Sequence, residues 1–342
     1  MPHKLSLIIP GLCGPIPDSE DLHASAVPLL DLLRSLRKEK ISAADEVGVL
    51  ADLFGLGIDA PFPYAAVALL AYGHDPGSDC WLHADPVNLQ ADMDRAILSD
   101  ARTLHIREDE AEKLVEQINA HFSEDGLSLI MADADNWFVR LDDCGLLTTP
   151  LDQAVGRNVN HLLPEGSRAA VWKRILNEAQ MLLHMSDVNQ QREHRGMDAI
   201  NSLWFWGEGR LPQPGDSDVT HVYADDAVTS GLAVLNRTKH SALTDPVVLA
   251  SAMKQHGHSL VSLQQLVGAC NYGDTPAWLD AMRELVEDWL AASIEAARSL
   301  HAEVNIYPCN GVRYHLGHHH KFDISKLIFW KKDRLQDHVE TQ

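Results

Sequence analysis

The apolar positions of residues 172–183 recur at steps of three and four residues, so they predict one apolar face of a helix. The polar run that follows stops at Gly196, and residues 200–206 (Ile-Asn-Ser-Leu-Trp-Phe-Trp) predict a buried strand. Gly207 and Gly209 come directly after this strand. Glycine lets the backbone approach a ligand closely, and open α/β sheets bind ligands at the carboxyl ends of parallel strands. The pattern therefore predicts a ligand site near the end of this strand.

The apolar pattern of the whole chain predicts an α/β protein. Residues 5–9 predict a first strand, and residues 304–316 predict a closing β-hairpin around an Asn-Gly turn. Residues 82–165 contain an amphipathic helix, a second hairpin and a turn-rich segment. We therefore expect a core made from residues 1–81 and 166–342, with 82–165 inserted as a small α+β subdomain.

The charge of the chain narrows the range of partners. The 342 residues have a formal net charge of −21, which would repel nucleic-acid phosphates and anionic lipid. No apolar stretch approaches the length of a membrane span, and the first residues do not resemble a secretory signal. We expect no nucleic-acid partner, no membrane partner and a cytoplasmic location.

The five cysteines are scattered and form no Cys-x-x-Cys motif. This spacing predicts neither a disulfide framework nor a zinc knuckle, and it agrees with a reduced cytoplasm. Cys13 follows the first predicted strand, where a nucleophile could stand, but no activating base is apparent nearby in the sequence.

Two polar stretches could carry chemistry. Residues 80–95 are rich in hydrogen-bonding groups, although an Asp-Pro turn with solvated charges would look the same. Near the carboxyl end, His318 and His320 alternate as on one strand face, and Asp323 could add an oxygen ligand for a metal. A basic segment that simply follows the predicted hairpin would explain this run of histidines equally well. Nucleotide-binding glycine motifs and a Gly-x-Ser-x-Gly elbow are absent from the sequence.

Two segments resemble a known family. The motif Asn-x-x-Arg before Asn-Ser-Leu-Trp-Phe-Trp-Gly-Glu-Gly, in residues 177–209, is similar to archaeal-type cofactor-independent phosphoglycerate mutases, as is Trp-Leu-His-Ala-Asp-Pro in residues 81–95. Together the two motifs look still more like the bacterial RpfE-type regulatory proteins. The resemblance implies an alkaline-phosphatase-like α/β core, a central sheet flanked by helices, with an inserted subdomain. In the catalytic relatives, Asp and His residues hold two divalent metals and a Ser or Thr accepts the phosphoryl group.

The sequence departs from the catalytic pattern at several positions. Residues 10–15 read Pro-Gly-Leu-Cys-Gly-Pro where the family has an Asp-Gly-x-x-Asp metal motif, and residues 269–274 replace an Asp-x-x-Gly-His motif. The late Gly-Asp-His motif is also missing, unless residues 318–320 substitute for it. We therefore expect a regulatory or ligand-sensing pseudoenzyme without a cofactor. The alternative is a metal-dependent phosphoglycerate mutase or phosphatase that holds manganese or zinc with displaced ligands.

The expected ligand site combines both motif segments. Its predicted lining is Asn189, Arg192, Asn201, Gly207, Gly209 and Arg210, bordered by Asp85, Asp94 and Arg95. The two guanidinium groups, Arg192 and Arg210, could each grip a small anionic ligand with two hydrogen bonds. Surface ion pairing in an acidic protein is the competing interpretation of both arginines. A protein partner is the other expectation.

Overall fold

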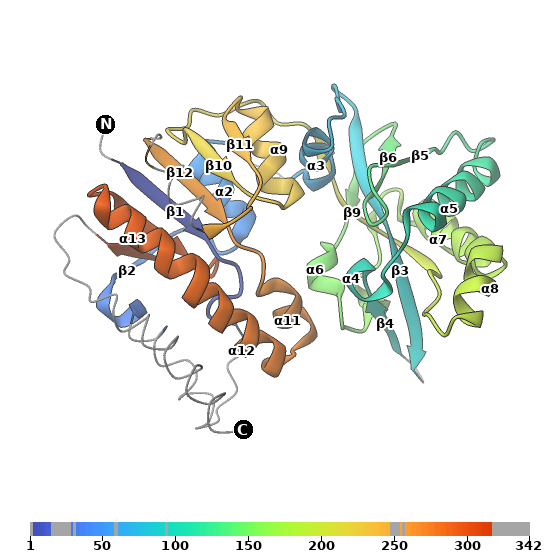
Figure 1. Ribbon diagram of the computed structural model, residues 1–342. Coiled ribbons are helices and arrows are strands. Elements are labelled where there is room, and N and C mark those ends of the chain that lie inside the picture. The colour runs from blue at the N-terminus through green and yellow to red at the C-terminus, as the bar shows by residue number, and fades with distance from the viewer. Residues whose placement is uncertain are drawn as a thin grey trace, which may run out of the picture. The chain divides into compact units, whose positions relative to one another are not determined.

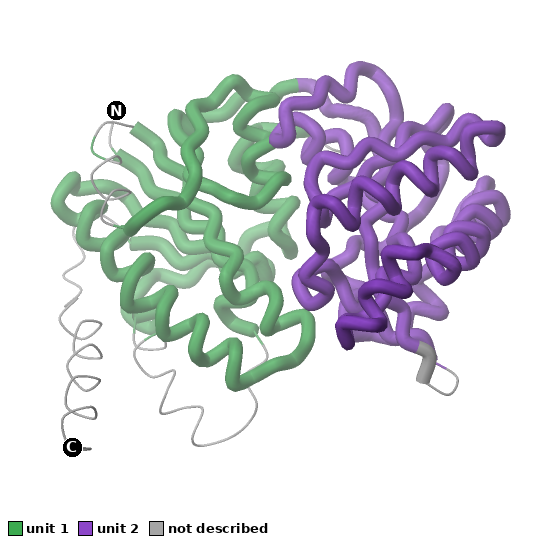
Figure 2. Tube along the Cα trace, turned by 45° about the vertical axis from the view of Figure 1, so that its right-hand side comes forward, with its two compact units in different colours: residues 1–57, 214–342 green, residues 58–213 purple. Residues whose placement is uncertain are grey.

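The computed structural model describes residues 3–14, 29, 32–57, 61–92, 95–246, 254 and 257–316. The chain divides into two compact units (Figure 2). Unit 1 contains residues 1–57 and 214–342, and unit 2 contains residues 58–213. No helix in the described ranges is both long and apolar enough to cross a bilayer.

Unit 1 contains a seven-stranded sheet with the order β11-β10-β12-β1-β13-β14-β2 (Figure 1). Five neighbouring strands are parallel, and β14 is antiparallel to both β13 and β2. The strands are β1 (Lys4–Ile8), β2 (Arg37–Lys40), β10 (His221–Tyr223), β11 (Lys239–Ser241), β12 (His258–Ser262), β13 (Glu303–Tyr307) and β14 (Val312–Leu316). The predicted first strand and the predicted closing hairpin are confirmed.

Helices flank this sheet. They are α2 (Glu46–Phe54), α9 (Ala227–Leu235), α11 (Val267–Tyr272), α12 (Thr275–Glu284), the π-helix η3 (Leu285–Leu290) and α13 (Ala291–Ser299). The last three form one continuous helix across a sheet face (Figure 1), and its residues Trp278 and Met282 share an apolar core with Leu5 and Val304 of the sheet. Asp274 caps the N-terminus of α12, because its side chain accepts a hydrogen bond from the amide of Ala277 at 3.0 Å.

Unit 2 is built on a second, antiparallel sheet in which β3 is the long central strand. Its strands are β3 (Cys80–Asp92), β4 (Arg95–Ser99), β5 (Leu129–Met131), β6 (Trp137–Leu141) and β9 (Ser202–Arg210), with a separate pair β7 (Leu146–Leu147) and β8 (Glu165–Gly166). Its helices are α3 (Tyr64–Ala71), α4 (Ala101–Leu104), α5 (Glu108–His121), α6 (Leu151–Ala154), η1 (Val159–His161), α7 (Ala169–His184) and α8 (Asp187–His194).

The two faces of β3 have different neighbours, because successive side chains of a strand point to opposite faces. Leu82 and Ala84 belong to an apolar core that includes residues of α5 and α7. His83 and Asp85 lie on the opposite face, where α3 packs against β9 (Figure 1). The sheet therefore separates an apolar core from a polar and aromatic layer.

The expected domain boundaries differ from the observed division. We expected the insertion to span 82–165, whereas the compact unit spans 58–213. The reason is strand pairing: β9 lies beyond the expected boundary but pairs with β3 along its length, from Cys80↔Arg210 to Val87↔Ser202. The predicted α/β class, with a central sheet flanked by helices, is confirmed.

Two expectations were wrong. The predicted strand at residues 200–206 belongs to β9, which is antiparallel, so its end is not the carboxyl edge of a parallel sheet. Cys80 and Cys144 form a disulfide, although the cysteine spacing predicted none. Their separation of 64 residues matches no short motif, and the pairing of β3 with β6 brings the two segments near each other.

Candidate functional site

The carboxyl end of β1 in unit 1 leads into a tightly packed loop. The indole nitrogen of Trp278 donates to the Gly11 carbonyl at 2.9 Å. A Cβ atom on Gly14 would lie 2.4 Å from the Cys270 sulfur, so only glycine fits there. Cys13 is exposed in this loop, yet desolvation by the surrounding protein raises the pKa of its thiol. The raised pKa does not favour a thiolate nucleophile.

Acidic side chains at this end of the sheet have neutral hydrogen-bond donors as partners. Ser262, the last residue of β12, donates to Asp226 at 2.7 Å, and Asp226 also accepts from the Thr229 amide at 2.7 Å. The Gln264 amide donates both to Ser262 and to Glu46. The network therefore joins carboxylates to hydroxyl and amide groups.

A surface hollow of about 360 Å³ lies near the opposite ends of the strands in unit 1. It is lined by Lys4, Asp52, Leu53, Asp216, Ser217 and Asp218. Asp218 is held by Lys4 at 3.6 Å and by His258 at 2.7 Å. Because ligands of parallel sheets bind at the carboxyl ends of strands, this hollow is not the candidate site.

Arg192, which we expected to bind an anion, is fully buried in unit 2. Its guanidinium donates to Glu110 at 2.6 Å and to the carbonyls of Asp198 and Leu104. Protein groups therefore occupy the hydrogen-bond donors of Arg192, and because Arg192 is buried, its ion pair with Glu110 does not lie at the surface.

The two predicted asparagines have structural partners as well. Asn189 donates to the carbonyls of Leu183 and Ile200 and accepts from the Ile200 amide, so it fixes the approach to β9. Asn201 accepts from the Leu89 amide at 2.8 Å and donates to the Leu89 carbonyl at 3.0 Å. Its side chain thus extends the pairing between β3 and β9.

The lack of a side chain at Gly207 and Gly209 lets β9 pack closely against residues 63 and 64 of the protein itself. A Cβ atom on Gly207 would lie 2.7 Å from the Tyr64 Cβ, and one on Gly209 would lie 2.4 Å from the Pro63 Cβ. Arg210 is exposed and donates to the Ser78 carbonyl.

The structure does not bring the other residues of the predicted ligand and metal sites together with those above. Arg95 is exposed at the start of β4. Asp94, His318, His320 and Asp323 lie outside the described residues.

Asp85 is the predicted residue that the structure places at the centre of a polar cluster. It is buried, accepts from the indole nitrogen of Trp206 at 2.6 Å and accepts from the Trp137 amide at 3.3 Å. His83 Nδ1 lies 3.2 Å from the same carboxylate. Because a carboxylate accepts, Nδ1 carries the hydrogen of this contact, and Nε2 is the ring nitrogen left for another partner.

His83 is the functional candidate that sequence reasoning missed. Its ring stacks on Trp206 with centroids 4.3 Å apart and contacts Phe138 at 4.5 Å. His83 is only 3 % exposed, yet its Nε2 has no hydrogen-bond partner among the described residues. An unpaired buried polar atom costs about 1–3 kcal/mol, so this nitrogen needs an explanation. The signal was present in the His-x-Asp spacing, which places both side chains on one strand face.

Acidic side chains surround the pair His83 and Asp85. Burial, followed by the charges of Asp133 and Asp85, raises the pKa of Asp135. Burial and Asp133 also raise the pKa of Tyr72 far above its usual range. The ring of Tyr72 lies 6.0 Å from that of Phe138, which contacts His83. The charged side chains that raise the pKa of Tyr72 and of Asp135 are therefore acidic ones, Asp133 and Asp85 among them.

With this geometry established, similarity to known proteins can be assessed. Residues 77–189 match the model of the 2,3-bisphosphoglycerate-independent phosphoglycerate mutase family. The chain is related to these mutases. The matched range lies within unit 2 and includes β3 with His83 and Asp85.

The mutase of Methanosarcina barkeri is 26 % identical over 119 residues, 34 % of this chain and 30 % of that protein. The mutase of Methanosarcina mazei is 25 % identical over 138 residues, 39 % of this chain and 35 % of that protein. The matches therefore span about a third of the length of these relatives.

The fold extends further than the sequence similarity. The PH0037 protein of Pyrococcus horikoshii aligns with a TM-score of 0.53 and 12 % identity, covering 93 % of this chain and 88 % of that one. At this level of identity the likeness concerns the fold alone.

Proposed function

We propose that this chain is a ligand-sensing regulatory protein, of the RpfE type, on a scaffold related to the phosphoglycerate mutases. In this proposal it does not transfer phosphoryl groups by the two-metal mechanism. The observation that carries the proposal is the unpaired Nε2 of His83, which is buried while Nδ1 is fixed by Asp85.

The arrangement of His83 suits recognition of a hydrogen-bond donor. In the neutral form that this proposal assigns to His83, Asp85 selects the tautomer with hydrogen on Nδ1, and the ring lies between Phe138 and Trp206, so the Nε2 lone pair has one direction. The acidic neighbours Asp133 and Asp135 favour a ligand that carries an ammonium or hydroxyl group. The proposed ligand class is therefore a small amine or amino alcohol.

Unit 1 supports the absence of phosphoryl transfer. Two closely spaced dications need several carboxylate or imidazole ligands. The loop after β1 instead contains Gly11, Cys13 and Gly14 packed against Trp278, and Asp226 is engaged by Ser262 and the Thr229 amide. The Asp226 carboxylate therefore accepts hydrogen bonds from neutral groups of the protein.

Tryptophan fluorescence tests the ligand proposal, because Trp206 both stacks on His83 and donates to Asp85. Titration with ethanolamine should change the emission and raise the melting temperature, whereas 3-phosphoglycerate should do neither. His83→Gln should abolish the response, while His121→Gln, at an exposed histidine, should retain it. A response to ethanolamine that is unchanged in His83→Gln would refute the role of His83.

A further inference from the structure

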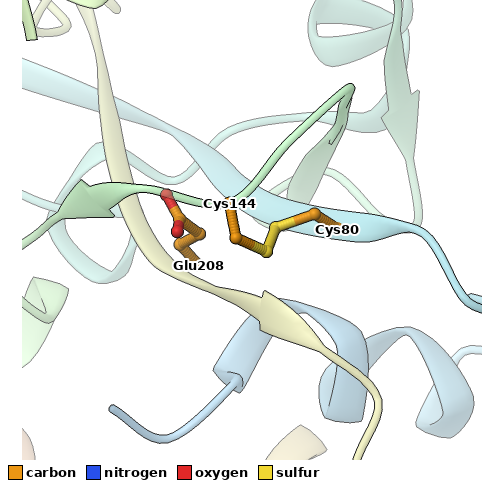
Figure 3. A group of neighbouring side chains, drawn as sticks. All are labelled: Cys80, Cys144 and Glu208. Carbon is orange, nitrogen blue, oxygen red and sulfur yellow. A yellow bond between two sulfur atoms is a disulfide. The ribbon is translucent and has the colours of Figure 1, made fainter. Parts of the chain in front are cut away.

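Cys80, Cys144 and Glu208 bring two sulfur atoms and a carboxylate together in unit 2 (Figure 3). One ligand atom from each residue lies within 4.8 Å of the other two. Within the described residues, no other group of three His, Cys, Asp or Glu side chains is gathered this closely. We propose that these residues form a zinc site when the disulfide is reduced. This proposal is independent of the ligand proposed for His83.

The three residues come from separate segments that the sheet holds in register. Cys80 is the first residue of β3 and is fully buried, and it pairs with Leu141 of β6 and with Arg210 of β9. Glu208 lies in β9, and Cys144 lies in the connection from β6 to β7. The pairing of β3 with β9 and β6 therefore holds Cys80 beside Glu208 and beside the strand that leads to Cys144.

Glu208 holds the Cys144 segment in place by hydrogen bonds of its own. Its two carboxylate oxygens accept from the amides of Gly145 at 2.7 Å and Leu146 at 2.8 Å. These amides follow Cys144 directly, so reduction of the disulfide leaves Cys144 tethered beside Cys80. Each oxygen retains a free lone pair for a metal, and the amides orient the carboxylate as outer partners of metal ligands do.

Two more hydrogen bonds join the segment after Cys144 to β9. The Gly207 amide donates to the Thr148 hydroxyl at 3.1 Å, and the Trp204 indole donates to the Thr149 carbonyl at 2.9 Å. Four side-chain or backbone hydrogen bonds thus hold this connection against β9 in addition to the disulfide. A site assembled this way is largely preorganised before a metal binds.

The donor set selects the metal. Two thiolates and one carboxylate suit Zn²⁺, which takes three protein ligands and leaves a fourth position for water. A dithiol reductant converts the disulfide to two thiols and is itself oxidised to a disulfide. Zn²⁺ then displaces one proton from each thiol. The disulfide and the zinc dithiolate exclude each other because they use the same sulfur atoms.

The test compares oxidised and reduced protein in zinc titrations against a chromophoric chelator. The full chain is reduced with dithiothreitol, which is then removed under argon. We expect one Zn²⁺ per reduced chain and none in the oxidised chain. Cys144→Ser should lose the site, and Glu208→Gln should weaken it at least about tenfold. Cys13→Ser, which removes an exposed free thiol, is the matched control and should bind zinc as the wild type does.

A second measurement covers the case in which a variant does not fold. Zn²⁺ should slow the alkylation of Cys80 and Cys144 in reduced wild-type protein, read by mass spectrometry, and should leave Cys13 unprotected. Failure of the reduced wild type to bind zinc would overturn the proposal. So would zinc binding by Cys144→Ser that equals the wild type, or alkylation of Cys144 that zinc does not slow.

Discussion

The guanidinium of Arg192 lies 2.6 Å from the carboxylate of Glu110, and both side chains are buried. Removing Arg192 breaks this buried pair at a cost of up to about 3–5 kcal/mol, although Arg195 still pairs with Glu110. Arg192→Met should lower the free energy of unfolding by that amount in urea titrations. Arg174→Met removes an arginine from the exposed pairs with Glu178 and Asp125, so it should cost at most about 1 kcal/mol. Equal losses in the two variants would contradict a structural role for Arg192.

The same pair predicts a loss of stability in acid. Burial acts to raise the pKa of Glu110, but hydrogen bonds from Arg195, the Arg107 amide and Arg192 lower it below its usual value. A carboxyl with a lowered folded pKa stabilises the protein above its unfolded pKa of about 4.3, and this stabilisation is lost as the pH falls through the folded pKa. Glu110→Gln should therefore flatten the dependence of unfolding free energy on pH below about 4.3. Profiles of wild type and variant that stay parallel there would rule out this contribution.

Two glycines with the same positive φ allow the cost of backbone strain to be measured apart from the cost of a steric clash. Gly196 and Gly207 both have φ of 70°, so alanine at either position costs about 1–2 kcal/mol in the left-handed region. A Cβ on Gly196 meets nothing within 4 Å, whereas one on Gly207 would clash with the Tyr64 Cβ at 2.7 Å. Gly207→Ala should thus lower the melting temperature clearly more than Gly196→Ala. Matching melting temperatures would mean that α3 does not pack against β9 as described.

The disulfide should stabilise the chain in the absence of zinc. It closes a connection with a sequence separation of 64 residues, and a bridge of this kind contributes about 2–4 kcal/mol. Dithiothreitol in metal-free buffer should lower the unfolding free energy of the wild type by that amount. The double variant Cys80→Ser with Cys144→Ser should not respond to the reductant. If both proteins responded alike, the effect would lie elsewhere in the chain.

Elements with local signals could be predicted from the sequence. The hairpin of β13 and β14 follows from Asn310-Gly311, and the start of α12 follows from Asp274 with a proline in the first turn. Both signals act within a few residues, so the surrounding fold does not change their meaning.

The site residues could not be predicted in the same way, because their partners are distant in sequence. Glu110 lies 82 residues from Arg192, and Leu89 lies 112 residues from Asn201. An Asn-x-x-Arg motif looks the same whether it binds a ligand or fixes a helix to a strand. In this structure the motif fixes helix α8 to its neighbours, whereas Asp85 shares a strand face with His83 because side chains alternate along β3.

The most direct test of the account is a turnover assay of the full chain loaded with Mn²⁺ or Zn²⁺, following interconversion of 2-phosphoglycerate and 3-phosphoglycerate. The account predicts no conversion above the buffer rate with either metal, even where zinc binds at Cys80 and Cys144. Conversion that requires the metal, stops on chelation and persists in Cys144→Ser would show a working phosphoryl-transfer centre and contradict the central claim.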